Sequence, residues 1–223
     1  MAYIGRSMAD FPVKSSTRRG TLAGLALIGW AGGADAAPSE RIVTLLGDSI
    51  TAGYGLAYRD SLPAQLQAEL KRLGVAARVR GAGVSGDTTA GGLARLDYSV
   101  RADTHLCVVA LGGNDLLRGL PPAKMQANLT AIVRKLKRRR IPVVLAGIQA
   151  PSVVNRAYAA QYNAAFRNVA KAEGVALYPD LVAGVAGVAA LNQPDRIHPN
   201  PRGVKVIAAR LAPFVARALK ARR

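Results

Sequence analysis

The stretch RIVTLLGDSITAGYG spans residues 41–55 and carries the main structural signal of the chain. Its first part, RIVTLL (41–46), is mostly apolar, as expected of a strand that is covered on both faces. Its second part, GDSITAGYG (47–55), contains three glycines, an acid, a serine and a threonine. A loop of this composition can cradle a phosphate, make an ordinary strand-to-helix turn, or present Ser49 as a nucleophile.

Apolar runs of the same kind recur along the chain. HLCVVAL (105–111) and IPVVLAGI (141–148) predict buried strands, and ARVRGAG (77–83) and VALYPD (175–180) are weaker strand candidates. Between these runs, apolar residues recur at helical spacing. Strands that alternate with helices predict a parallel sheet between two helix layers, in one α/β domain. The helical stripes are Leu62, Leu66, Leu70 and Leu73; Met125, Leu129, Ile132, Val133 and Leu136; Tyr158, Tyr162, Phe166 and Val169; and Val204, Ile207, Leu211 and Val215.

Glycine and small polar residues gather where the predicted strands end. GDSIT follows the first strand, GVSGDTT (83–89) the second, and GGNDLLRG (112–119) the third. In open parallel sheets, ligands bind outside the carboxyl ends of the strands. The fifth strand leads to DRIHPNPRG (195–203), where Asn200 can cap the last helix and Pro201 suits its first turn.

The two histidines of the chain are predicted to lie at opposite edges of the sheet. His105 begins a strand, which favours a structural role, whereas His198 follows Asp195 by three residues on the loop edge. A nucleophilic serine needs an imidazole to accept its proton, and the imidazole needs a carboxylate to orient it. A lone D-x-x-H also suits a capping Asp beside an exposed His. Because three glycine-rich loops share the edge, we favour Ser49, His198 and Asp195 as catalytic residues.

Several other chemistries lack their sequence patterns. The chain has no G-x-x-x-x-G-K-[ST] and no G-x-G-x-x-G that opens a helix, so GDSIT does not match a phosphate loop. Ser49 lies in G-D-S-I-T, not in the G-x-S-x-G of α/β-hydrolases. One cysteine, two distant histidines and no H-E-x-x-H argue against a catalytic metal site.

Composition indicates a soluble, globular protein with a strong positive charge. Of 223 residues, 50% are hydrophobic and 20% charged, and the formal net charge is +18. This charge fits a solvated basic surface, or anionic partners such as nucleic acid, lipid headgroups or coenzyme A. The run RKLKRRR (134–140) opposes the negative end of a helix dipole and is also a candidate contact for anionic lipid or acyl-CoA. The single cysteine, Cys107, excludes an intramolecular disulfide and is expected to be a buried apolar side chain.

The first 36 residues have the anatomy of a signal peptide. Arg18 and Arg19 precede an apolar segment over residues 22–31, and the small residues ADA (34–36) follow. STRRGTL resembles a twin-arginine export signal, and the ordinary secretory route is the alternative. Cleavage after Ala36 would remove four basic and two acidic residues, leaving 187 residues with a net charge of +16. We therefore expect a signal peptide over 1–36, a single domain over 37–223, and a periplasmic or secreted protein.

Four blocks of the sequence, in order, resemble the SGNH hydrolases, also called the GDSL esterase/lipase family. These blocks are GDSITAGYG, GVSGDTT, GGND and DRIHPN. The likeness covers nearly the whole of 37–223, including ARL (94–96) and LRG (117–119), and is strongest to the bacterial thioesterase I, lysophospholipase and arylesterase subgroup. It implies a flavodoxin-like three-layer α/β/α sandwich with a five-stranded parallel sheet.

The resemblance also assigns roles within the site. It makes Ser49 the nucleophile, His198 the general base and Asp195 the residue that orients it. The oxyanion hole would comprise the backbone N–H groups of Ser49 and Gly86 and the side-chain amide of Asn114. Asp48, Asp115, Ser85, Thr88 and Thr89 are expected to organise the loops by hydrogen bonds.

The sequence also departs from the subgroup at two places. An asparagine usually stands where Gly81 lies, so the loop that carries Gly86 is expected to be looser. The loop QAPSVVNRAY (149–158) lacks the Asn-Tyr-Gly expected before Tyr158. This loop borders the acyl site in the family, so the acyl preference is the property that the departure affects.

We expect an exported serine hydrolase that cleaves small acyl esters and thioesters through an acyl-enzyme, without a cofactor or metal. A carbohydrate O-acetylesterase is the enzymatic alternative, because the same residues serve acetyl-sugar esters. A basic, non-enzymatic protein that binds the cell envelope is a third hypothesis, based on the charge alone. No nucleic-acid partner is expected.

Overall fold

A five-stranded, all-parallel sheet organises residues 40–221, the part of the chain that the computed structural model describes. The strand order is β2-β1-β3-β4-β5, which is the flavodoxin-like order and confirms the predicted fold class. The strands are β1 (Arg41–Gly47), β2 (Ala77–Gly83), β3 (Leu106–Ala110), β4 (Val143–Ala146) and β5 (Ala176–Tyr178).

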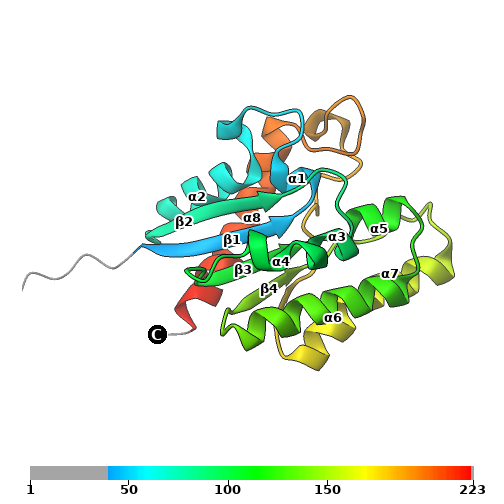
Figure 1. Cartoon of the computed structure of the whole chain (residues 1–223). Helices are drawn as coiled ribbons and strands as arrows, with labels where there is room; N and C mark the ends of the chain where they lie inside the picture. The colour runs from blue at the N-terminus through cyan, green and yellow to red at the C-terminus, as the bar shows by residue number, and fades with distance from the viewer. Residues whose placement is uncertain (1–39, 222–223) are drawn as a thin grey trace, which may run out of the picture. The chain divides into compact units, whose positions relative to one another are not determined.

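Helices cover both faces of this sheet, as Figure 1 shows: α2 and α8 lie on one side, and α6 and α7 on the other. Shorter helices, α1, α3 and α5, follow the carboxyl ends of three strands. The helices are α1 (Ser49–Ala52), α2 (Leu62–Arg72), α3 (Thr89–Ala94), α4 (Leu96–Ser99), α5 (Gly113–Leu117), α6 (Pro122–Arg138), α7 (Arg156–Glu173) and α8 (Pro201–Lys220), with the 3-10 turns η1 (Tyr58–Asp60) and η2 (Ala189–Leu191).

Alternate residues of β3 face the two halves of the core. Leu106 and Val108 pack with α2 and α8, whereas Cys107 and Val109 pack with α6 and α7. All five residues of β3 are buried, which explains why the strand is a continuous apolar run rather than an alternating one. Cys107 is buried as predicted, and its burial raises the thiol pKa to about 12.

The ends of the longer helices follow the sequence signals. The Asn200 side chain accepts hydrogen bonds from the N–H groups of Arg202 and Gly203, and Pro201 is the first residue of α8, as predicted. Gly174, with φ of 64°, ends α7 in the left-handed conformation. The basic residues Lys135, Lys137 and Arg138 lie in the last turn of α6, which confirms the predicted placement of that charge run.

The backbone of α1 lies directly against the ends of β1 and β2, which are paired at Gly47 and Gly83. A Cβ on Gly83 would lie 2.7 Å from the carbonyl oxygen of Asp48 and would also overlap the amide nitrogen of Ala52. A Cβ on Gly47 would lie 2.8 Å from the Cβ of Thr51. Glycine at both strand ends therefore allows α1 to turn back over the sheet edge.

The predicted strands and the observed ones differ only at their ends. The runs 105–111 and 141–148 shorten to residues 106–110 and 143–146, because the flanking residues are not part of the strands. His105 lies at the amino edge, where its Nδ1 accepts the Ile42 N–H at 3.0 Å, consistent with a structural role. Among residues 40–221, no helix is both long and apolar enough to cross a membrane. The predicted signal peptide lies outside the described residues.

The close contact at Gly83 predicts a specific loss of stability. We expect Gly83→Ala to lower the free energy of unfolding by about 1–3 kcal/mol, because the new methyl group meets backbone atoms that cannot rotate away. Arg78→Ala, at an exposed position of the same strand, should stay within about 0.5 kcal/mol of wild type. Urea unfolding of the three proteins measures both effects. Equal midpoints for Gly83→Ala and wild type would contradict the packing argument.

Candidate active site

Ser49, His198 and Asp195 form one continuous chain of hydrogen bonds. The Oγ of Ser49 lies 2.9 Å from Nε2 of His198, and Nδ1 of the same ring lies 2.6 Å from Oδ2 of Asp195. Ser49 is the first residue of α1, and the other two residues lie on the loop before α8. The structure therefore brings together three residues that span nearly 150 positions of sequence, in the arrangement that the sequence predicts. Their catalytic roles stay predictions.

The Asp195 carboxylate is held in its charged form. Its Oδ1 accepts the backbone N–H groups of Ile197 and His198, and its Oδ2 faces the imidazole. The backbone N–H and the ring of His198, followed by the N–H of Ile197, lower the pKa of this carboxyl to about 2. An ionised carboxylate at Nδ1 fixes the tautomer in which Nε2 is free to accept a proton from Ser49.

Two residues that the sequence analysis did not select support this chain of hydrogen bonds. The ring of Tyr54 lies 4.6 Å, centroid to centroid, from the His198 ring. The side chain of Gln193 donates to the carbonyl oxygens of Tyr54 and Pro199, at 2.8 and 3.1 Å. Gln193 thus ties the loop after α1 to the loop that carries His198. Tyr54 lies within the GDSITAGYG stretch, but no local signal marks Gln193.

Two of the three predicted oxyanion donors, Gly86 and Asn114, lie in the segments that follow β2 and β3. Gly86 has φ of 82°, a conformation that favours glycine, and its carbonyl accepts a hydrogen bond from Arg118 at 2.7 Å. The side-chain nitrogen of Asn114 donates to the carbonyl of Asp87 at 2.9 Å. An amide nitrogen carries two hydrogens, so one stays available to a ligand. Ser49, Gly86 and Asn114 all line the same cavity.

Four of the five other polar residues of the loops form hydrogen bonds that organise these loops, as predicted; for Ser85 this role stays a prediction. Asp48 accepts the N–H of Ile50 at 3.1 Å and caps α1. Asp115 accepts both the N–H and the hydroxyl of Thr89, at 2.8 and 2.6 Å. Thr88 caps α3 by accepting the N–H of Gly91, at 3.3 Å. Ser85 lines the cavity.

A side chain of α7 holds the GGND turn (112–115) in place. The hydroxyl of Tyr162, which is fully buried, donates to the carbonyl of Gly112 at 3.0 Å. Gly112 has φ of 123°, and a Cβ there would lie 2.9 Å from the ring of Phe166. Tyr162 and Phe166 are therefore core residues, as predicted from their helical spacing, and they also hold the loop of Asn114.

A cavity of about 530 Å³ opens beside Ser49. Ser49 and His198 are among its polar lining residues, and most of the lining surface is apolar. Arg196, which has φ of 59° although it is not glycine, also lines this cavity. The apolar lining comes from α5 and from the loops after β4 and β5: Leu116, Leu117, Ile148, Val182, Val185, Ala186 and Ile197.

The sequence matches the GDSL-like Lipase/Acylhydrolase family over residues 45–206. The esterase TesA of Pseudomonas aeruginosa is 40% identical over 162 residues, which cover 72% of this chain and 81% of the relative. The thioesterase 1/protease 1/lysophospholipase L1 of Escherichia coli K12 is 33% identical over 157 residues, which cover 70% of this chain and 74% of the relative.

The fold has relatives among solved structures as well. The crystal structure of AlinE4, an SGNH-hydrolase family esterase, superimposes with a TM-score of 0.69 at 40% sequence identity. The match covers 82% of this chain and 98% of that chain. The family match and the layered fold therefore confirm the resemblance found in the sequence.

The burial of Asp48 predicts that the stability of the folded protein depends on pH. Burial raises the pKa of Asp48 from 3.8 to about 6, so the folded state loses stability as the pH rises through about 6. Asp48→Asn keeps the acceptor for the N–H of Ile50 and removes the buried charge. We expect this variant to gain on wild type between pH 4 and pH 7, by at most about 3 kcal/mol at about 1.4 kcal/mol per pKa unit. Thermal melts across this range measure the difference.

Asp103→Asn provides a control of opposite sign. The hydrogen bond from Arg80 lowers the pKa of Asp103 to about 2, so its ionised form stabilises the folded protein above pH 4. This variant should lose stability relative to wild type as the pH rises from 2 to 5. A pH-independent difference between Asp48→Asn and wild type would show that the burial of Asp48 does not penalise its charge.

Proposed function

The chain belongs to the GDSL-like lipase/acylhydrolase family of ester hydrolases, and from this premise we propose that it cleaves acyl esters and thioesters through a covalent acyl-enzyme. The observation that carries the proposal is the hydrogen-bonded chain from Asp195 through His198 to Ser49, which ends at an apolar cavity. A serine hydroxyl is a weak nucleophile unless a base is positioned to accept its proton.

The geometry supports a two-step acyl transfer. Ser49 Oγ attacks the carbonyl carbon of the substrate while Nε2 of His198 accepts the hydroxyl proton. The resulting imidazolium is stabilised by Asp195 and returns the proton to the leaving alcohol or thiol. Water then attacks the acyl-enzyme, again with His198 as the base, and releases the acid and the free serine.

Negative charge that develops on the carbonyl oxygen needs preorganised donors. The backbone N–H groups of Ser49 and Gly86 and the free hydrogen of the Asn114 amide are the candidates, since all three residues line the cavity. A donor of this kind typically lowers the activation barrier by about 3 kcal/mol. No cofactor or metal is required by this mechanism.

The cavity favours an acyl substrate over an acetylated sugar. A sugar O-acetyl group would leave most of the apolar lining unoccupied, whereas an acyl chain can cover it and gain about 0.8 kcal/mol per buried methylene. One relative carries the names thioesterase and lysophospholipase, which agrees with acyl substrates. A panel of acetyl-xylan and p-nitrophenyl esters of increasing chain length separates the two hypotheses.

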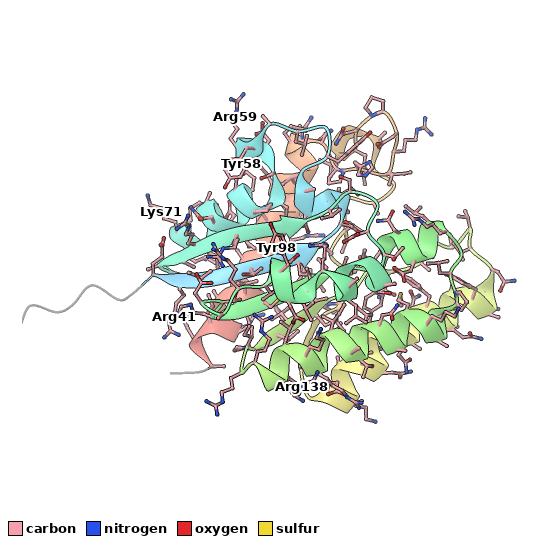
Figure 2. The ribbon with its side chains drawn as sticks, viewed as in Figure 1. Arg41, Tyr58, Arg59, Lys71, Tyr98 and Arg138 are labelled. Carbon is pink, nitrogen blue, oxygen red and sulfur yellow. The ribbon has the colours of Figure 1, made fainter. Side chains whose placement is uncertain are left out.

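The positive charge does not by itself favour a non-enzymatic binding protein. Figure 2 shows Arg41, Arg59, Lys71 and Arg138 projecting from four separate parts of the described structure. These four side chains belong to β1, η1, α2 and α6, which fits basic charge spread over a solvated surface. Contact with anionic lipid stays a prediction, and its test is salt-dependent binding to anionic vesicles.

We further propose that the enzyme is exported, with residues 1–36 as a cleaved signal. This proposal rests on the sequence alone, namely the Arg18-Arg19 pair, the apolar segment and the ADA sequence. These residues lie outside the described structure. Amino-terminal sequencing of the protein recovered from the periplasm or medium tests it. An uncleaved, cytoplasmic product would contradict it.

The mechanism predicts separate effects at the nucleophile and at the oxyanion hole. Ser49→Ala should lower kcat by several orders of magnitude, because no other group in the cavity is activated by His198. Asn114→Ala should lower kcat by about 100-fold or more with little change in KM, because its donor acts in the transition state. Hydrolysis of p-nitrophenyl butyrate measures both.

Labelling with a fluorophosphonate probe controls for folding. Wild type and Asn114→Ala should both be labelled, and Ser49→Ala should not, while all three should share the same melting temperature. Wild-type turnover by Ser49→Ala would contradict the proposed nucleophile.

The positive charge of Arg196 in the cavity lining predicts a preference among leaving groups. Arg196 is the one non-glycine residue with positive φ in the cavity lining of the described structure, and glycine can replace it without backbone strain. For substrates of equal acyl length, Arg196→Gly should lower kcat/KM for an acyl-CoA relative to a p-nitrophenyl ester, by about 2- to 5-fold at low salt. Arg140→Gly is a matched control, because Arg140 also has φ of 59° but lies outside this cavity. Equal ratios in both variants would contradict the prediction.

A further inference from the structure

We propose that Arg95 is a positioning residue that holds the nucleophile strand and the oxyanion loop in a fixed relation, acting through Asp87 on Asn114. Arg95 lies between α3 and α4, and its side chain is only 19% exposed. It does not line the cavity beside Ser49. This inference deepens the proposed function and rests on it.

The guanidinium of Arg95 connects three segments that are distant in sequence. Its Nη2 donates to the carbonyl of Gly47 at 2.8 Å, at the end of β1 and two residues before Ser49. Its Nη1 donates to the carbonyl of Ala82 at 2.9 Å, at the end of β2. Its Nε donates to the carboxylate of Asp87 at 2.5 Å, in the loop that carries Gly86.

Asp87 connects Arg95 to the proposed oxyanion hole. Its carboxylate pairs with Arg95, and its own main-chain carbonyl accepts the Asn114 amide at 2.9 Å. The same carbonyl determines the orientation of the Asn114 amide, because only the NH₂ group can donate a hydrogen bond to it. A shift of Asp87 would therefore turn the amide of Asn114 away from the developing oxyanion.

The residue types fit this role closely. Only a guanidinium offers several donors in a rigid, planar arrangement that reaches these three segments and the Ser99 hydroxyl at once, and the three donors of a lysine ammonium share one atom. The Arg95–Asp87 pair is mostly buried, at 19% and 16% exposure, so water competes weakly for these hydrogen bonds. A Cβ on Gly91 would lie 2.5 Å from Oδ1 of Asp87, so glycine at this position leaves room for the carboxylate.

A purely structural role would give a different result from a positioning role. A residue that only stabilises the fold changes the melting temperature but leaves kcat unchanged below it. A residue that positions Asn114 lowers kcat more than it raises KM, and its effect depends on the presence of Asn114. A double-mutant cycle between positions 95 and 114 therefore separates the two roles.

The experiment measures kcat, KM and melting temperature for Arg95→Lys, Asn114→Ala and the double variant, with p-nitrophenyl butyrate as substrate. We expect Arg95→Lys to lower kcat by about 10- to 100-fold with KM within about 2-fold, as for a catalytic group displaced by about 1 Å. In the Asn114→Ala background the same change should lower kcat by less than about 3-fold.

Arg80→Lys is the matched control. Arg80 lies on β2, is 23% exposed, and forms a two-bond ion pair with Asp103 at 2.8 and 2.9 Å. It contacts neither Asp87 nor Asn114, so kcat should stay within about 2-fold of wild type, as for a surface ion pair. If Arg95→Lys does not fold, Asp87→Ala provides the same test, since it removes the carboxylate but keeps the carbonyl that faces Asn114.

Three outcomes would overturn the inference: an unchanged kcat in the folded variant, full additivity with Asn114→Ala, or an equal loss in Arg80→Lys. The failure of the proposed function has a different signature, since Ser49→Ala would then keep its activity. An inactive Ser49→Ala together with a fully active Arg95→Lys rejects only the role of Arg95.

Discussion

The close approach of α1 to the ends of β1 and β2 is the constraint on which the site depends. Because Gly47 and Gly83 have no side chains, the first turn of α1 lies on the sheet edge instead of above it. Ser49 is thereby placed at the start of a short helix, within 2.9 Å of an imidazole that belongs to a loop nearly 150 residues later. A bulkier residue at either strand end would displace the nucleophile together with the helix.

The rest of the loop edge is organised by hydrogen bonds between segments that are distant in sequence. Arg95 links the ends of β1 and β2, Gln193 links the loop after α1 to the loop of His198, and Tyr162 holds the GGND turn from beneath. These side chains mostly bond to main-chain carbonyls. Such contacts fix loop backbones that have no regular secondary structure of their own, and so fix the direction of each backbone N–H donor.

Two electrostatic environments coexist around Ser49. Asp195 accepts two backbone N–H groups and the imidazole, which keeps its pKa near 2, whereas burial raises the pKa of Asp48 to about 6. Asp195 is thus maintained in its charged form beside His198, whereas the surroundings of Asp48 disfavour its charged form. The difference arises because burial dominates at Asp48, whereas hydrogen bonds from His198 and Ile197 dominate at Asp195.

The sequence by itself determined the parallel sheet, the loop edge on which chemistry is expected, and the residue types of the site. Apolar runs such as 105–111 and the four glycine-rich blocks are local signals, because burial on both faces and tight turns restrict residues one position at a time. The strand order was implied only by the family resemblance. The registration of Gly47 with Gly83 and the partners of Arg95 and Gln193 were decided only by the tertiary structure. Their donors and acceptors lie up to 139 positions apart and include backbone carbonyls, which every residue type carries, so no local pattern distinguishes them.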